Sequence, residues 1–145
     1  MPQPPPKSDT PQFPRKLSET GLFASVKDLK PAAGVIPYDV VAPLWSDGAI
    51  KERLMAVPGD AKIEFDAVTY PLDAPGNIPG WRFPDGTVFV KTFSLELEPG
   101  NPKSARRLET RLLHHIKMPG NDDEYGAQVW NGYTYVWNDE QTDAE

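Results

Sequence analysis

The chain has 145 residues, a formal net charge of -6 at pH 7 and no cysteine. The absence of cysteine excludes disulfides, a thiolate zinc site and covalent haem attachment within these residues. The negative charge argues against a general nucleic-acid binder, because phosphate contacts need a basic surface. No apolar run approaches the roughly 18 residues that span a bilayer. Met1 is followed by polar residues and prolines, so we expect no signal peptide.

The first 14 residues, MPQPPPKSDTPQFP, are dominated by proline and polar residues. Such a segment is extended and semi-rigid and has few side chains to bury. We therefore predict a proline-rich, disordered linker or tail over residues 1–14 and one β-domain over residues 15–145. A proline-rich ligand for a partner domain is the alternative role of the linker.

One or two short helical turns are predicted at the start of the domain. Residues 17–23, LSETGLF, fit one turn, which Ser18 would cap and Gly21 would end. Residues 24–33 would add a second turn before Pro31 stops it. The apolar side chains of Leu17 and its neighbours would then cover the sheet.

Two short extended segments follow. Pro37 confines residues 35–41 to a sheet edge or an irregular stretch, because proline cannot donate to a neighbouring strand. Residues 51–57 and 61–66 flank a tight Pro-Gly-Asp loop, which predicts a hairpin. Residues 67–80 hold three prolines and two glycines and are predicted to form a long loop.

The stretch that organises the chain is residues 81–97, WRFPDGTVFVKTFSLEL. Pro84 and Asp85 suit the second and third positions of a β-turn, and Gly86 suits the position after them. The run behind this turn is rich in β-branched and aromatic residues, and its first half is apolar on both faces. That pattern is typical of a central strand.

Residues 106–117 and 127–138 are predicted to be two further antiparallel strands. Helix competes over residues 106–117, because arginine, leucine and glutamate are good helix formers. We favour a strand, since a plausible antiparallel partner follows. The predicted fold is all-β: an antiparallel β-sandwich or a partly open barrel.

Aromatic residues are the first candidates for a binding site. Tyr133, Tyr135 and Trp137 recur with period two, which either builds a sheet core or presents a platform for sugar rings. We favour the core, because large apolar patches are seldom left open. Trp45, Trp81 and Trp130 could add to an aromatic surface, and Trp81 is expected to be exposed.

Charged residues in otherwise apolar strands are the second candidates. Lys91, Glu109 and Arg111 lie in predicted strands, where buried charges must be paired or neutralised. We predict a structural ion network of these three, with Asp47 as a further partner. A catalytic use of Lys91 with Glu109 is the alternative, and it requires a concave pocket around them.

No metal site is predicted. His114 and His115 are adjacent, so in a strand they would point to opposite faces and could not easily share one ion. The acidic stretch 121–124 lacks the spacing of a calcium loop. No nucleophile elbow, phosphate loop or dinucleotide fingerprint occurs either, so we expect a non-catalytic module.

Several stretches together resemble a known type of module. They are LSETGLF at 17–23, GVIPYDVVAPLWSDGAIKERLMAVP at 34–58, FPDGTVFVKTF at 83–93, RRLETRLL at 106–113 and YTYVWNDEQTDAE at 133–145. They resemble an uncharacterised module that precedes the c-type cytochrome domain in exported bacterial proteins of the dihaem cytochrome type. The resemblance spans roughly residues 16–145.

The resemblance implies an accessory role in electron transfer. It suggests a periplasmic or secreted module that docks a c-type cytochrome domain on the same polypeptide or in the same complex. The haem-attachment motif of that family lies downstream of the segment matched by residues 133–145. Haem c would therefore belong to a downstream domain, and no cofactor is expected within this chain. A carbohydrate-binding module, with a polysaccharide as ligand, is the alternative function.

Overall fold

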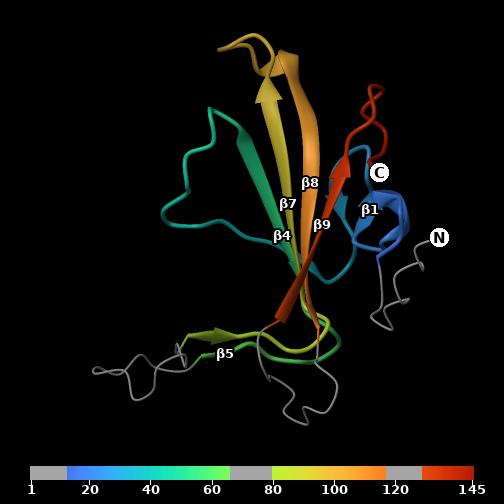
Figure 1. The fold of residues 1–145 in the computed structure, drawn as a ribbon, viewed down its shortest axis with the longest axis vertical. Coiled ribbons are helices and arrows are strands. Elements are labelled where there is room, and N and C mark those ends of the chain that lie inside the picture. The colour runs from blue at the N-terminus through green and yellow to red at the C-terminus, as the bar shows by residue number, and fades with distance from the viewer. Residues whose placement is uncertain (1–12, 66–79, 117–128) are drawn as a thin grey trace, which may run out of the picture.

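The computed structural model describes residues 13–65, 80–116 and 129–145. Its main element is a five-stranded antiparallel sheet with the strand order β3-β4-β7-β8-β9 (Figure 1). Those strands are β3 (Val35–Pro37), β4 (Ile50–Ala56), β7 (Val88–Glu96), β8 (Ala105–Ile116) and β9 (Val129–Val136).

Two small sheets and two 3-10 turns complete the described parts. The small sheets pair β1 (Phe23–Ser25) with β2 (Lys30–Pro31), and β5 (Glu64–Phe65) with β6 (Trp81–Arg82). The turns are η1 (Leu17–Glu19) and η2 (Pro102–Ser104). No helix in the described ranges is long and apolar enough to cross a membrane.

The predicted all-β antiparallel fold is confirmed, and the sheet is open rather than closed. The prediction of a central strand is also confirmed, since β7 lies between β4 and β8. Residues 105–116 form a strand, not the competing helix, because β9 pairs with β8 along most of its length. Period-two alternation then divides the side chains between two faces of the sheet.

One face of the sheet carries the hydrophobic core. Val90, Leu112 and Tyr135 from three neighbouring strands are at most 4% exposed. Leu17 of η1 is fully buried against them, as predicted for the cover over the sheet. The N-terminal segment and the C-terminal residues lie together on this side of the sheet, and the connection 38–49 lies on the other (Figure 1).

The predicted hairpin between residues 51–57 and 61–66 is wrong. β4 pairs with β3 and β7, whereas Glu64 and Phe65 pair with Arg82 and Trp81 in a separate small sheet. Seven residue pairs join β4 to β7, from Ile50↔Ser94 to Ala56↔Val88. Cross-strand side-chain pairs along this register stabilise the distant pairing.

Three predicted turns differ from the structure. The Thr87 N–H donates to the Pro84 carbonyl at 3.2 Å, so Pro84 opens the turn and Gly86, with φ of 81°, occupies its third position. Ser18 lies inside η1 instead of capping it; Lys16 is the N-cap. Residues 24–33 hold the β1–β2 pairing instead of a second helical turn.

Three predicted segments lie wholly or mostly outside the described residues. These are most of the proline-rich linker, the loop 67–80 and the acidic stretch 121–124. The last two linker residues are described and pack on the domain. The Phe13 ring meets the Tyr133 ring edge-on at 5.2 Å, and the Pro14 carbonyl accepts a hydrogen bond from Tyr135. The packed region therefore includes Phe13 and Pro14, which the prediction assigned to the linker.

Candidate functional site

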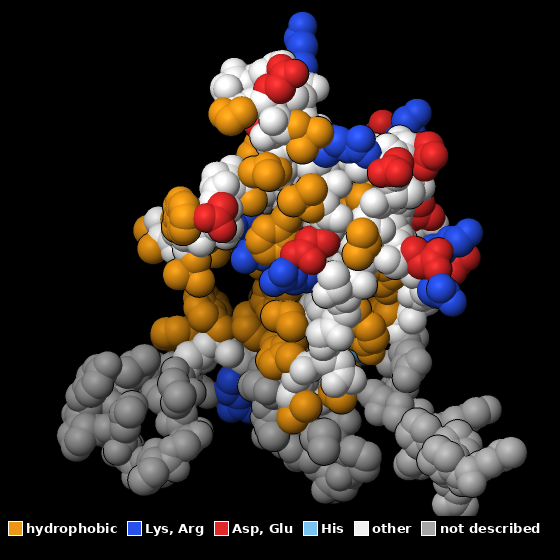
Figure 2. Space-filling model, turned by 45° about the horizontal axis from the view of Figure 1, so that its top comes forward, with side chains coloured by type: hydrophobic (Ala, Val, Ile, Leu, Met, Phe, Trp, Pro, Cys, Tyr) orange, Lys and Arg blue, Asp and Glu red, His pale blue; other side chains and the backbone are white. Residues whose placement is uncertain are grey.

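The second face of the sheet is only partly covered. We call it the open face; it carries Phe89, Lys91 and Phe93 of β7 and their cross-strand neighbours on β4, β8 and β9. Apolar side chains on it reach solvent: Leu113 is 48% exposed and Val136 63%. Hydrophobic side chains and opposite charges gather side by side on the surface shown in Figure 2. A face that only had to meet water would be polar.

A groove of about 790 Å³ runs along the open face. The connection between β3 and β4 borders it on one side with Tyr38, Val40 and Leu44. Phe89, Lys91 and Phe93 of the central strand also line it. Its size is that of an ordinary small-molecule pocket, which is typically about 300–1,000 Å³.

Three basic residues cross the groove in a row. Arg53 of β4 is the direct partner of Lys91 on β7, and Lys91 is the direct partner of Arg111 on β8. We call these three residues the cationic row. Like charges directly opposite each other destabilise a sheet, so the fold alone gives no reason for this arrangement.

The two arginines of the cationic row have acidic partners. Arg53 Nη1 lies 2.7 Å from Asp39 Oδ1, and Arg111 Nη2 lies 2.5 Å from Glu109 Oε1. Lys91 has none: within the part of the chain that the structure describes, no carboxylate forms an ion pair with it. The central cation of the row is thus left without a counter-ion among the described residues.

The surroundings of Lys91 disfavour its charge. Partial burial lowers the pKa of the Lys91 ammonium, and the positive charges of Arg53, Lys51 and Arg111 lower it further. The Lys91 Nζ lies 5.1 Å from the centroid of the Phe93 ring, and the Arg111 guanidinium lies 4.9 Å from the same centroid. The ring stabilises both cations through its negative face but neutralises neither.

The structure brings together part of the predicted ion network. Glu109 and Arg111 form the ion pair described above. Lys91 lies beside Arg111 but forms no ion pair with Glu109. Asp47 is exposed, with a positive φ of 49° in the connection between β3 and β4. A concave surface does surround Lys91 and Arg111, as the catalytic alternative requires, although Glu109 does not line it.

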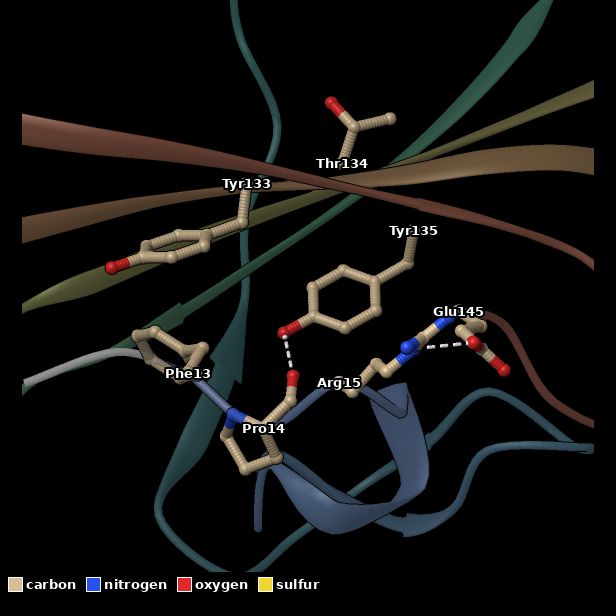
Figure 3. A pocket seen from close by; sticks show the side chains of 7 residues that line it. All are labelled: Phe13, Pro14, Arg15, Tyr133, Thr134, Tyr135 and Glu145. Carbon is tan, nitrogen blue, oxygen red and sulfur yellow. Dashed lines mark hydrogen bonds and ion pairs between the residues drawn. The ribbon is translucent and has the colours of Figure 1, made fainter. Parts of the chain in front are cut away.

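The aromatic stripe of β9 serves mainly the core. Tyr135 is 4% exposed and Trp137 6%, while Tyr133 is half-buried and packs against the core. Figure 3 shows Tyr133 and Tyr135 pointing toward the N-terminal segment and Thr134 pointing the other way. The Tyr135 hydroxyl donates to the Pro14 carbonyl at 2.7 Å. The preferred core interpretation of Tyr135 and Trp137 therefore agrees with their burial.

The cavity in Figure 3 has a volume of about 570 Å³ and lies at the edge of β9. Arg15 and Glu145 border it and form an ion pair of 2.5 Å. Its polar groups are therefore largely engaged with one another. It offers less for a ligand than the groove on the open face.

The other three tryptophans do not belong to the aromatic stripe of β9. Trp130 is half-buried, and its ring lies 5.4 Å from the Phe89 ring at one end of the open face. Trp45 is 82% exposed and Trp81 65% exposed, as expected for Trp81. The connection that carries Trp45 and the β5–β6 sheet that carries Trp81 lie at different places in the molecule (Figure 1).

The two histidines lie on opposite faces, as predicted. His114 meets the Phe13 ring edge-on at 5.0 Å on the core side, and His115 packs against Trp130 on the other side. His115 is 1% exposed, and its Nδ1 lies 3.1 Å from the Pro84 carbonyl oxygen. No cluster of three or more histidine, aspartate or glutamate residues suited to a metal ion occurs among the described residues.

Sequence reasoning missed Arg53 as part of the site. Arg53 and Met55 are two residues apart, so in a strand they share one face. The presence of a charged residue on this otherwise apolar face was the sequence signal that could have identified Arg53 as a site residue. Arg53 joins Lys91 only because β4 pairs with β7. The incorrect hairpin prediction for β4 hid that contact.

Comparison of the chain with protein-family models, with curated proteins and with solved structures found no match in any of the three.

Proposed function

We propose that this chain is a non-catalytic docking module that binds a c-type cytochrome domain through the open face. The resemblance of residues 16–145 to modules that precede such domains supports the identity of the partner. In this proposal the module is periplasmic or secreted, and haem c resides on the partner. The module positions the cytochrome domain for electron transfer.

The observation that carries the proposal is the exposed apolar surface on the open face. Leu113 and Val136 point away from the core, and Leu44 of the neighbouring connection is 83% exposed. Contact surfaces combine such apolar side chains with charged groups that fix the orientation of the partner. The cationic row supplies the charged groups here.

The test measures binding of this chain to a c-type cytochrome domain of the kind that the resemblance implies, by calorimetry and by ¹H–¹⁵N chemical-shift mapping. Leu113→Asp places a charge on the open face and is expected to weaken binding at least about tenfold. Phe65→Asp is the matched control, because Phe65 is 56% exposed in the separate β5–β6 sheet. Equal binding by both variants, or shifts that avoid the open face, would refute the proposal.

Carbohydrate binding is a second candidate, and the exposure of Trp45 and Trp81 favours it. Trp81 stands beside Phe65, with ring centroids 4.9 Å apart, but the two ring planes are tilted by 55°. A flat sugar platform needs rings that are more nearly coplanar. Trp81→Ala and Trp45→Ala should each abolish retention on a polysaccharide column if this candidate is correct, and retention by neither the parent nor the variants would rule it out.

A further inference from the structure

The groove on the open face has the composition of a binding site for a small anionic ligand. Aromatic rings line it, and the cationic row crosses it. We propose that the groove binds an organic monocarboxylate with a flat apolar body, whose carboxylate pairs with Lys91. This inference goes beyond the docking function and does not depend on it.

The number of uncompensated charges indicates a single negative charge on the ligand. Asp39 and Glu109 each pair with one arginine of the row, which leaves Lys91 as the one member without an ion-pair partner among the described residues. A monoanion balances that charge. A phosphate dianion would add a negative charge that the row does not match.

The aromatic side chains that line the groove indicate that the ligand has a flat, apolar body. Phe89 and Phe93 lie two residues before and two residues after Lys91 on the same face of β7. The Tyr38 ring meets the Phe89 ring at 5.7 Å, on the side where the connection borders the groove. An aromatic or similarly flat group would therefore lie along β7 while its carboxylate reaches Lys91.

Arg111 would orient the carboxylate. Its guanidinium is adjacent to Lys91 across β7 and β8 and is 58% exposed, so donors remain available beyond those that Glu109 engages. A carboxylate between Lys91 and Arg111 also offsets the repulsion within the row. Binding would thus offset the causes that lower the pKa of Lys91.

The experiment compares 2-naphthoate with 2-naphthamide, which has the same ring system without the charge, by calorimetry and ¹H–¹⁵N chemical-shift mapping. We expect 2-naphthoate to bind at least about tenfold more tightly, with shifts centred on β7 and β8. Equal affinity of the two compounds, or no binding of 2-naphthoate, would overturn the proposal. Inorganic phosphate that competes as well as the carboxylate would overturn the assignment to a monocarboxylate.

Variants locate the contact. Lys91→Met keeps the length of the side chain and should weaken 2-naphthoate binding at least about tenfold, whereas Lys91→Arg should retain most of it. Lys103→Met is the control, because Lys103 is exposed in η2, outside the groove. Circular dichroism verifies that each variant is folded. Unchanged binding by Lys91→Met would show that the ligand binds elsewhere.

Discussion

The hydroxyl oxygens of Thr92 and Thr110 lie 2.8 Å apart on the buried face of the sheet, where β7 and β8 pair these two residues directly. The indole Nε1–H of Trp137 donates to the same Thr110 oxygen at 3.0 Å. Thr92 is 2% exposed and Thr110 is fully buried. One hydroxyl therefore serves two buried polar groups in the centre of the core.

Thr110→Val should cost at least about 2 kcal/mol of the free energy of unfolding. The substitution keeps the shape of the side chain but leaves the Trp137 N–H and the Thr92 hydroxyl buried without a partner, and such groups cost about 1–3 kcal/mol each. Urea denaturation measures the loss. Thr134→Val on the exposed side of β9 is the control, and its effect should stay within about 0.5 kcal/mol. Similar losses in both variants would contradict this role of Thr110.

Gly86→Ala should destabilise the protein by about 1–3 kcal/mol. Gly86 has a φ of 81°, a conformation that costs an L-residue about 1–2 kcal/mol. A Cβ atom there would also lie 3.0 Å from Pro58 Cγ. Thermal unfolding followed by circular dichroism measures the change.

Gly132→Ala is the matched control for Gly86→Ala. A Cβ atom at Gly132 would lie 3.9 Å from Leu113 Cδ2, an ordinary van der Waals contact, and Gly132 does not have a positive φ. The change should be neutral or slightly stabilising, since alanine suits a strand better than glycine. A loss as large as that of Gly86→Ala would show that backbone conformation is not the cause.

The local patterns of the sequence predicted the strands but not all of their partners. The first half of the run behind the Pro84 turn is apolar on both faces, and that pattern predicted that β7 lies at the centre of the sheet. The partner of β4 could not be read in the same way. A nearby turn favours a hairpin, whereas the observed β4–β7 pairing joins residues about 40 positions apart, such as Arg53 and Lys91.

The candidate site was harder to predict than the fold for the same reason. Lys91 and Arg111 stood out as charges within apolar strands, which is a local property. Their alignment with Arg53 depends on the register of three strands, and the groove depends on the path of the connection 38–49 over the sheet. Neither property is encoded in a short sequence pattern.

Asp143→Asn should reduce stability at neutral pH and have no effect at low pH. Burial raises the pKa of the Asp143 carboxyl, but hydrogen bonds from Ser18 and Ala144 outweigh that effect, so the pKa lies below its usual 3.8. The Ser18 Oγ–H donates to Asp143 at 2.6 Å and the Ser18 N–H at 3.1 Å. These bonds tie η1 to the C-terminal residues.

A lowered carboxyl pKa contributes stability above the unfolded-state pKa, and this contribution is lost as the pH falls through the folded-state pKa. We therefore expect Asp143→Asn to cost about 1 kcal/mol at pH 6, a modest value because the site is partly exposed. The difference from the parent should shrink steadily below about pH 4. Urea titrations at several pH values test this, with Asp139→Asn at a fully exposed aspartate as the control. A difference independent of pH would contradict the ionic origin.

Lys91→Met should increase the free energy of unfolding at pH 7. Burial and the charges of Arg53, Lys51 and Arg111 lower the Lys91 pKa, so the folded state disfavours the ammonium that the unfolded state carries freely. Replacing it removes the repulsion of like charges across two strand pairs, worth about 0.2–1 kcal/mol for each pair. Urea denaturation without added ligand measures the gain, and Lys103→Met should show none.

The pH dependence of the stability gained by Lys91→Met distinguishes an effect of the lysine charge from an effect of side-chain packing. A lowered lysine pKa means that the unfolded state binds more protons between the folded-state pKa and the usual 10.5, so the parent gains stability as the pH rises through this range. The advantage of Lys91→Met should therefore decrease toward pH 10.5, whereas a packing effect would stay constant. A less stable variant at pH 7 would show that Lys91 supports the fold. A more stable one would show that Lys91 costs stability there, as expected of a residue whose role is to bind an anion.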